Sequence, residues 1–237
     1  MVLTGKSKFS GRVHIERGML SVSSFNSVKT KMPQSSLGVP ADAEAGEILM
    51  GDGDGTVPKG DGPCGLIYTG AGETTDRIIN LAGKNSVVTF EQAGSGHLKF
   101  TSPIVISGFG GNKQITLSGE MAGSGEFTGD LFDPHDRAGK AKTSVTKSGP
   151  GVWTLSGVNT YTGPTIVKQG ILRITQAKGL RKETEVEISQ GAKLNLDFAG
   201  EVQVTKLTID GKAMAPGSYS AANAGGSISG KGVLVVK

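Results

Sequence analysis

Apolar residues in this chain come in runs of about five positions, and Gly, Ser, Asn or Asp residues separate one run from the next. Within most runs apolar and polar side chains alternate, which is the period of a β-strand with one buried face. Such runs occupy residues 65–69, 77–81, 86–90, 103–107, 114–118, 185–189, 193–198 and 204–210. Helical periodicity is nearly absent, since its best candidate at residues 177–187 is short and contains Gly179. The pattern predicts an all-β chain of many short strands.

One pattern of twenty residues occurs twice, at residues 3–22 and 155–174. Identical pairs are Leu3/Leu155, Gly5/Gly157, Gly11/Gly163, Gly18/Gly170 and Leu20/Leu172. Pairs of the same character are Thr4/Ser156, Phe9/Tyr161, Ser10/Thr162, Ile15/Val167 and Val22/Ile174. Self-similarity of this length indicates a chain built from stacked units.

Short strands at regular spacing fit either an antiparallel sandwich or a solenoid. A shorter motif, a Gly-x-Gly turn followed by alternating apolar residues, begins at Gly94, Gly123, Gly149 and Gly230. Two-residue hairpin signals are scarce, and Asp210-Gly211 is the clearest of them. Repeats of about 20 residues with three strand-like pieces therefore favour a single-stranded parallel β-helix, or β-solenoid, which we expect to be right-handed.

Residues 149–174 read GPGVWTLSGVNTYTGPTIVKQGILRI. This segment resembles the autotransporter-associated β-strand repeat, also called the passenger-associated transport repeat, in its Gly-x-Gly strand, its LSG at residues 155–157 and its NTYTG at residues 159–163. Pro164 stands where the family usually has glycine, and it should stiffen that corner. In the copy at residues 3–22 the NTYTG has become SKFSG.

Further segments extend this resemblance over most of the chain: residues 68–83, 191–198, 207–223 and 226–236. The resemblance implies a secreted or surface-exposed bacterial protein, often a very large one, in whose passenger the repeats aid folding outside the cell. It indicates architecture and leaves activity open.

The second copy is preceded by a strand-like segment at residues 148–157, whereas the first opens at the start of the chain. We therefore expect residues 1–237 to be one β-helical domain from a longer repeat protein, with a terminal repeat region at residues 185–237. Neighbouring repeats of that longer chain are then its expected partners.

Glycine accounts for 38 of 237 residues, about twice its usual share of ~7%, which fits many tight turns. Cys64 is the only cysteine, so no internal disulfide forms, and a small buried residue is its expected role. The net charge of +4 is mild, and the lysines are scattered with few aromatic residues between them. This composition argues against nucleic-acid binding. No apolar run approaches the roughly 20 residues of a membrane-spanning helix.

The most acidic loop, residues 51–65, contains Asp52, Asp54 and Asp61, whose oxygens are potential calcium ligands. The loop lacks both the twelve-residue EF-hand layout and the tandem nonapeptides of calcium-binding β-rolls. A solvated insertion between coils is the alternative interpretation. No other cofactor is expected.

An enzyme on a β-helix needs carboxylates that converge on one face. Asp130, Asp133 and Asp136, with His135 and Arg137 beside them, are the candidates, and a polar loop is the simpler interpretation. The cluster at residues 73–77 (ETTDR) is expected to be a structural corner held by hydrogen bonds.

The sequence thus predicts a structural or adhesive segment of an extracellular or cell-surface protein, without catalysis of its own. Surface glycans or a host surface are its possible ligands. A β-helical polysaccharide hydrolase or lyase and a calcium-dependent adhesion module are the alternatives.

Overall fold

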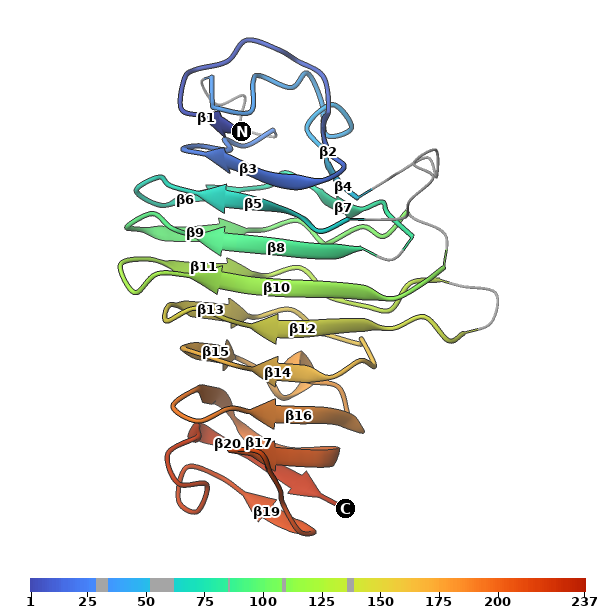
Figure 1. The fold of residues 1–237 in the computed structure, drawn as a ribbon, viewed down its shortest axis with the longest axis vertical. Helices are drawn as coiled ribbons and strands as arrows, with labels where there is room; N and C mark the ends of the chain where they lie inside the picture. The colour runs from blue at the N-terminus through green and yellow to red at the C-terminus, as the bar shows by residue number, and fades with distance from the viewer. Residues whose placement is uncertain (29–33, 52–61, 85, 108–109, 136–138) are drawn as a thin grey trace.

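The structure is a computed structural model. It describes residues 1–28, 34–51, 62–84, 86–107, 110–135 and 139–237. The chain winds from its N-terminus to its C-terminus as a stack of coils (Figure 1), and nearly all pairing between coils is parallel and in register. The predicted all-β parallel β-helix is confirmed. Among the described residues no helix is long and apolar enough to cross a membrane.

Two sides of the coil are long ladders of strands. The first ladder stacks β1 (Val2–Leu3), β3 (Gly18–Val22), β5 (Cys64–Tyr68), β8 (Val87–Gln92), β10 (Lys113–Gly119), β12 (Thr143–Lys147), β14 (Thr165–Val167), β16 (Thr184–Ile188) and the end of β17 (Lys193–Ile209). The second ladder stacks β6 (Glu73–Thr75), β9 (His97–Phe100), β11 (Ser124–Phe127), β13 (Val152–Leu155), β15 (Ile171–Ile174), the start of β17 and the start of β20 (Ile228–Val236).

The third side carries a ladder of its own in the upper coils and a strand again where β17 crosses it. Its ladder consists of β2 (Val13–Ile15), β4 (Ile48–Met50) and β7 (Ile79–Leu81), followed by a single parallel bridge from Asn80 to Val105. Below this bridge the described chain crosses the third side in turns and irregular segments, including the short 3-10 helix η1 (Ala177–Gly179), until the middle of β17 pairs there with β20. In the described residues the third side therefore has no ladder between the Asn80–Val105 bridge and β17.

The winding is right-handed. In Figure 1 the near strands β8 and β10 run to the left, and the far strands β9 and β11 run back to the right, while the chain descends. This is the hand expected for a crossover between parallel strands.

The predicted repeat of about 20 residues holds in the lower coils. Along the first ladder Val145, Thr165, Val186 and Leu207 are successive register partners, and they lie 20 or 21 residues apart. Upper coils are longer because insertions leave at the corners, as between the partners Leu20 and Leu66. Insertions thus change coil length without changing strand register.

The two copies of the twenty-residue pattern lie on different sides of the coil. In the copy at residues 155–174 the last two strands, β14 and β15, belong to the first and second ladders. The corresponding strands at residues 3–22 are β2 and β3, which belong to the third and first ladders. A unit of strand, glycine turn and second strand fits either corner of the coil. The motif therefore determines the local conformation but not which sides of the coil its strands occupy.

Inward side chains stack in columns along the core. On the second ladder Phe100, Phe127 and Trp153 lie one above another, with ring centroids 4.8 and 5.5 Å apart. Trp153 is 1% exposed and donates its indole N–H to the Ser118 carbonyl. Burial of Trp153 in the core, which the sequence favoured over a sugar-binding role, is confirmed.

The bottom of the stack ends in two antiparallel strands, β18 (Lys212–Ala213) and β19 (Gly217–Tyr219). Asp210 and Gly211 form the two-residue turn between β17 and β18, and both have positive φ angles, 51° and 75°. The Asp-Gly hairpin signal is therefore confirmed.

Close approach of successive coils at the corner between the two long ladders predicts a large effect of Gly96→Ala. An added Cβ at Gly96 would lie 1.8 Å from the Ala71 carbonyl oxygen. We expect a loss of about 2 kcal/mol or more in the free energy of unfolding, measured by urea denaturation. Gly11→Ala is the control because nothing lies within 4 Å of its Cβ, and it should leave stability unchanged. Equal stability of both variants would contradict close coil packing at this corner.

Candidate functional site

The three candidate calcium ligands, Asp52, Asp54 and Asp61, lie outside the described residues. The calcium site therefore stays a prediction. Within the described ranges no group of three or more His, Cys, Asp or Glu residues could hold a metal ion.

The candidate catalytic carboxylates Asp130 and Asp133 are bonded to the backbone. Asp130 accepts a hydrogen bond from the Val158 amide at 2.7 Å, and Asp133 accepts from the amides of Thr143 and Thr162 at 2.8 and 3.0 Å. Both carboxylates therefore hold neighbouring segments in place, as in a polar structural loop. Asp136 lies outside the described residues.

Cys64 lies in β5 with 1% of its surface exposed, and its register partners are Gly18 and Val88. A thiol buried at this depth packs as a small apolar residue, which agrees with its expected role.

The residues at 73–77 clamp the insertion that follows β3. The Glu73 carboxylate accepts hydrogen bonds from the amides of Phe25 and Asn26 at 2.7 and 3.0 Å. Asp76 accepts from the Val28 amide at 2.6 Å, and the Thr75 hydroxyl donates to the Asn26 carbonyl at 2.6 Å. The expected hydrogen-bonded corner is present, and it holds a segment about fifty residues earlier in the chain.

Arg77 completes this clamp from inside. Its side chain is 1% exposed and donates to the carbonyls of Phe25 and Leu37 at 2.7 Å each, and to the Asn26 side-chain oxygen at 2.9 Å. Burial lowers the pKa of Arg77 to about 10, and the nearby Glu73 opposes that shift. The guanidinium therefore stays charged at neutral pH and satisfies carbonyls that the insertion would otherwise bury unpaired.

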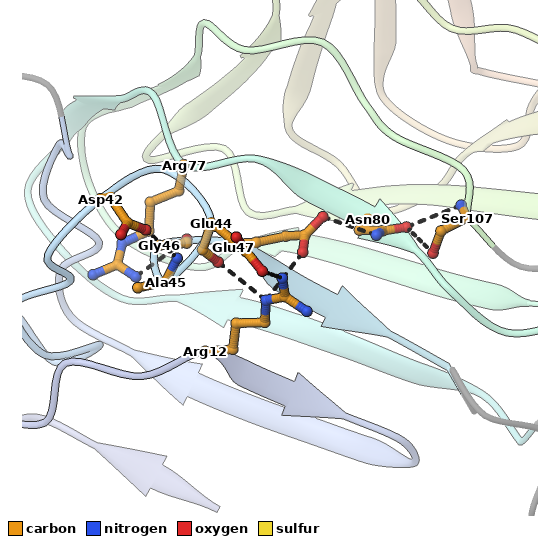
Figure 2. A network of polar contacts seen from close by, with 9 residues as sticks. All are labelled: Arg12, Asp42, Glu44, Ala45, Gly46, Glu47, Arg77, Asn80 and Ser107. Carbon is orange, nitrogen blue, oxygen red and sulfur yellow. Dashed lines mark hydrogen bonds and ion pairs between the residues drawn. The ribbon is translucent and has the colours of Figure 1, made fainter.

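A second polar network crosses the third side (Figure 2). Arg12 pairs with Glu44 and Glu47 at N–O distances of 2.5 and 3.3 Å. Glu47 accepts from the Asn80 amide group at 2.8 Å, and the Asn80 side-chain oxygen accepts from the Ser107 hydroxyl at 2.8 Å. Successive coils are thus tied together at the point where the third ladder ends.

The outer surface of the second ladder carries a cluster that the sequence did not reveal. His97 Nδ1 lies 2.8 Å from the Ser124 hydroxyl, and Nε2 lies 3.1 Å from Glu126. Glu126 also accepts from Ser156 at 2.6 Å and pairs with Lys99 at 3.3 Å. Burial alone would raise the pKa of Glu126, but these hydrogen bonds outweigh it and the pKa is lowered.

Serine, histidine and glutamate in this order suggest a nucleophile with its base. The Ser124 amide, however, donates to the Gly96 carbonyl within the ladder. In-plane amides used in this way cannot form an oxyanion hole above the sheet. The cluster therefore forms a hydrogen-bonded link between β9, β11 and Ser156, which directly follows β13.

On the third side, below the last strand bridge, lies a groove of about 410 Å³. Its lining residues include Val158, Ala177, Leu180 and Val202, together with the charged side chains Lys178, Arg181, Lys182 and Glu201.

One segment of the chain matches a known protein family. A family model described as Passenger-associated-transport-repeat matches residues 145–174. Residues 145–174 thus match the passenger-associated transport repeat. Over 111 residues the chain is also 36% identical to the adhesin BmaC autotransporter of Brucella suis biovar 1 (strain 1330). That alignment covers 46% of this chain and 3% of the relative, so the chain spans a small part of that protein's length. No solved structure matches the chain significantly.

The NTYTG of the passenger-associated transport repeat ties three coils together. Asn159 is 2% exposed; its side chain accepts from the Leu131 amide in the coil above at 2.9 Å and donates to the Gly179 carbonyl below at 2.7 Å. Tyr161 is fully buried and its hydroxyl lies 2.7 Å from that of Thr165. These contacts explain why the repeat combines an amide and an aromatic residue at a turn.

The same repeat buries a lysine at the end of β12. Lys147 has no exposed surface, and its Nζ donates to the carbonyls of Ser148 and Gly149 at 2.7 Å each and of Gln169 at 3.1 Å. Burial lowers the pKa of Lys147 to about 8. The ammonium thus joins carbonyls of two successive coils at one corner.

The buried clamp predicts unequal effects for two arginines. Arg77→Met leaves carbonyls of the insertion without donors, so we expect a loss of about 3 kcal/mol or more in the free energy of unfolding. Hydrogen exchange should also become faster at residues 34–46. Arg12→Met removes a partly exposed ion pair and should cost about 1 kcal/mol or less. Similar losses for the two variants would contradict the clamp.

The lowered pKa of Lys147 predicts a pH dependence. Between its folded value of about 8 and the ordinary value of roughly 10.5, the unfolded chain binds more protons than the folded one. Stability should therefore rise with pH in this window for the wild type relative to Lys147→Met, by about 2 kcal/mol from pH 8 to pH 10. Urea denaturation at several pH values measures the difference.

The exposed Lys168→Met variant is the matched control and should parallel the wild type. A constant difference between wild type and Lys147→Met across this range would contradict a buried ammonium.

Proposed function

We propose that this chain is a rigid segment of a bacterial cell-surface passenger, with a structural and adhesive role and without catalysis of its own. One observation carries the proposal: the passenger-associated transport repeat at residues 145–174 lies within two ladders that continue above and below it in register. The same two ladders run through the described coils outside this repeat.

The structural part follows from how the coils pair. Each coil forms backbone hydrogen bonds with the coil above and the coil below, and adds its side chains to one continuous core. Bending such a stack would break ladder bonds and core contacts on one side. A chain of this kind holds whatever lies beyond it at a fixed distance from the cell.

The adhesive part is supported by the relative's name and by the outward surfaces of the ladders. Outward side chains on the second ladder carry both charges, as in the Lys99–Glu126 and Arg173–Asp197 pairs. Glycans or a host surface are the proposed ligands, since flat polar surfaces suit extended polar partners. We also propose that this segment lies outside the cell.

The enzyme alternative is weaker because Asp130 and Asp133 are engaged with backbone amides. The calcium-dependent adhesion module remains an alternative that depends on Asp52, Asp54 and Asp61.

The adhesive role is tested by coating microspheres with the purified chain and measuring their retention on immobilised glycans and on mammalian cell monolayers. Folded chain should retain the microspheres at least tenfold better than chain unfolded by heat before coating. The heat-unfolded chain is the matched control because its composition and charge are the same. Equal retention by the two coatings on every surface would contradict an adhesive role.

A further inference from the structure

The groove on the lower third side lies where two successive coils cross that side without strands. The third ladder ends at the Asn80–Val105 bridge. Below it the chain crosses this side in irregular segments around residues 158–160 and 177–182, and then in the middle of β17 at residues 201–202, which pairs with β20. These irregular segments are less flat than strands, and the hollow lies between them and β17. The groove is therefore a built feature of three successive coils.

The floor of the groove is apolar and its edge is basic. Leu180 and Val202 are 1% and 4% exposed and continue into the core, while Val158 is 38% exposed. Lys178, Arg181 and Lys182 are exposed, and Glu201 is the one acidic side chain in the lining. Cations thus outnumber anions on this surface.

Arg181 is held in position. Its Nη1 donates to the Thr160 carbonyl at 2.8 Å, which links the guanidinium to the coil above. One of its five N–H donors is used in this bond, and a guanidinium has further donors for a bidentate contact with a carboxylate or sulfate. An anchored arginine loses less conformational entropy on binding than a free one.

We propose that this groove binds an acidic polysaccharide. Its carboxylate or sulfate groups pair with Lys178, Arg181 and Lys182, and its hydroxyls donate hydrogen bonds to Glu201. This inference rests on the proposed adhesive function and names the class of ligand.

The presence of Glu201 separates this ligand from other polyanions. A carboxylate repels a bare phosphate polymer but accepts hydrogen bonds from sugar hydroxyls. Apolar faces of sugar rings suit the exposed Val158, and the charged groups on the same chain suit the basic edge. A polysaccharide with both hydroxyl and anionic groups matches every part of the lining.

The test measures binding of the full chain at 0.15 M salt to immobilised heparin, to polygalacturonate and to neutral dextran. Heparin supplies sulfate and polygalacturonate supplies carboxylate alone, so the two arms distinguish the sources of charge. We expect binding to at least one acidic polymer and none to dextran. The groove variant, Lys178→Gln with Arg181→Gln and Lys182→Gln, should bind about tenfold more weakly or worse, since it removes the charged donors that pair with the anionic groups.

The matched control is Lys168→Gln with Lys206→Gln and Lys212→Gln, which removes the same charge from exposed positions outside the groove. It should lose less than about threefold in affinity, because surface charges away from the site contribute only weakly at this ionic strength. Thermal unfolding of both variants checks that they fold as the wild type does.

Equal losses of affinity in the groove variant and the control variant would overturn binding in the groove, since diffuse electrostatic attraction would then explain the binding. Failure of the wild type to bind either acidic polymer, while coated microspheres still adhere, would overturn this inference and leave the proposed adhesive function standing. Failure of both assays would overturn both proposals.

Discussion

Parallel pairing in register between successive coils is the constraint on which the rest of this structure depends. Every coil must return its strands to the same positions, because backbone amides that miss their partners are left unpaired next to the core. Variation is therefore confined to the corners. Between Leu20 and Leu66 the chain makes a long excursion and then resumes the same register. Glycines such as Gly96 let carbonyls of neighbouring coils approach more closely than any side chain would permit.

Excursions at the corners bring polar backbone into the interior, and buried polar side chains satisfy it. Arg77 serves the insertion around residues 25–46, Lys147 serves the corner at Ser148 and Gly149, and Asn159 joins the coils above and below its own. Each of these side chains bonds several groups at once. Polar residues thus stabilise the places where repetition is interrupted, and apolar columns stabilise the places where it continues.

Alternation and glycine turns predicted the strands, the Asp210-Gly211 hairpin and the core position of Trp153, because each depends on local sequence. Contacts between coils were harder to predict, since they depend on coil length. His97 and Ser124 are register partners that lie 27 residues apart in the chain. A shift of one residue in the strand register would turn one of the two side chains inward. The cluster at residues 73–77 was recognisable as a corner, but its partners near Phe25 were not, because insertions obscure the spacing.

The same reasoning places a binding surface on the third side. On the two long ladders each strand pairs with its neighbours, and outward side chains such as Lys99 and Glu126 pair across strands. Such surfaces are flat, and part of their charge is already paired. Where the third ladder ends, turns replace strands, and side chains such as Lys178 and Lys182 project beside a hollow. A ligand gains most where a fold leaves both concavity and uncompensated charge. In a solenoid those conditions coincide where one ladder stops while the others continue.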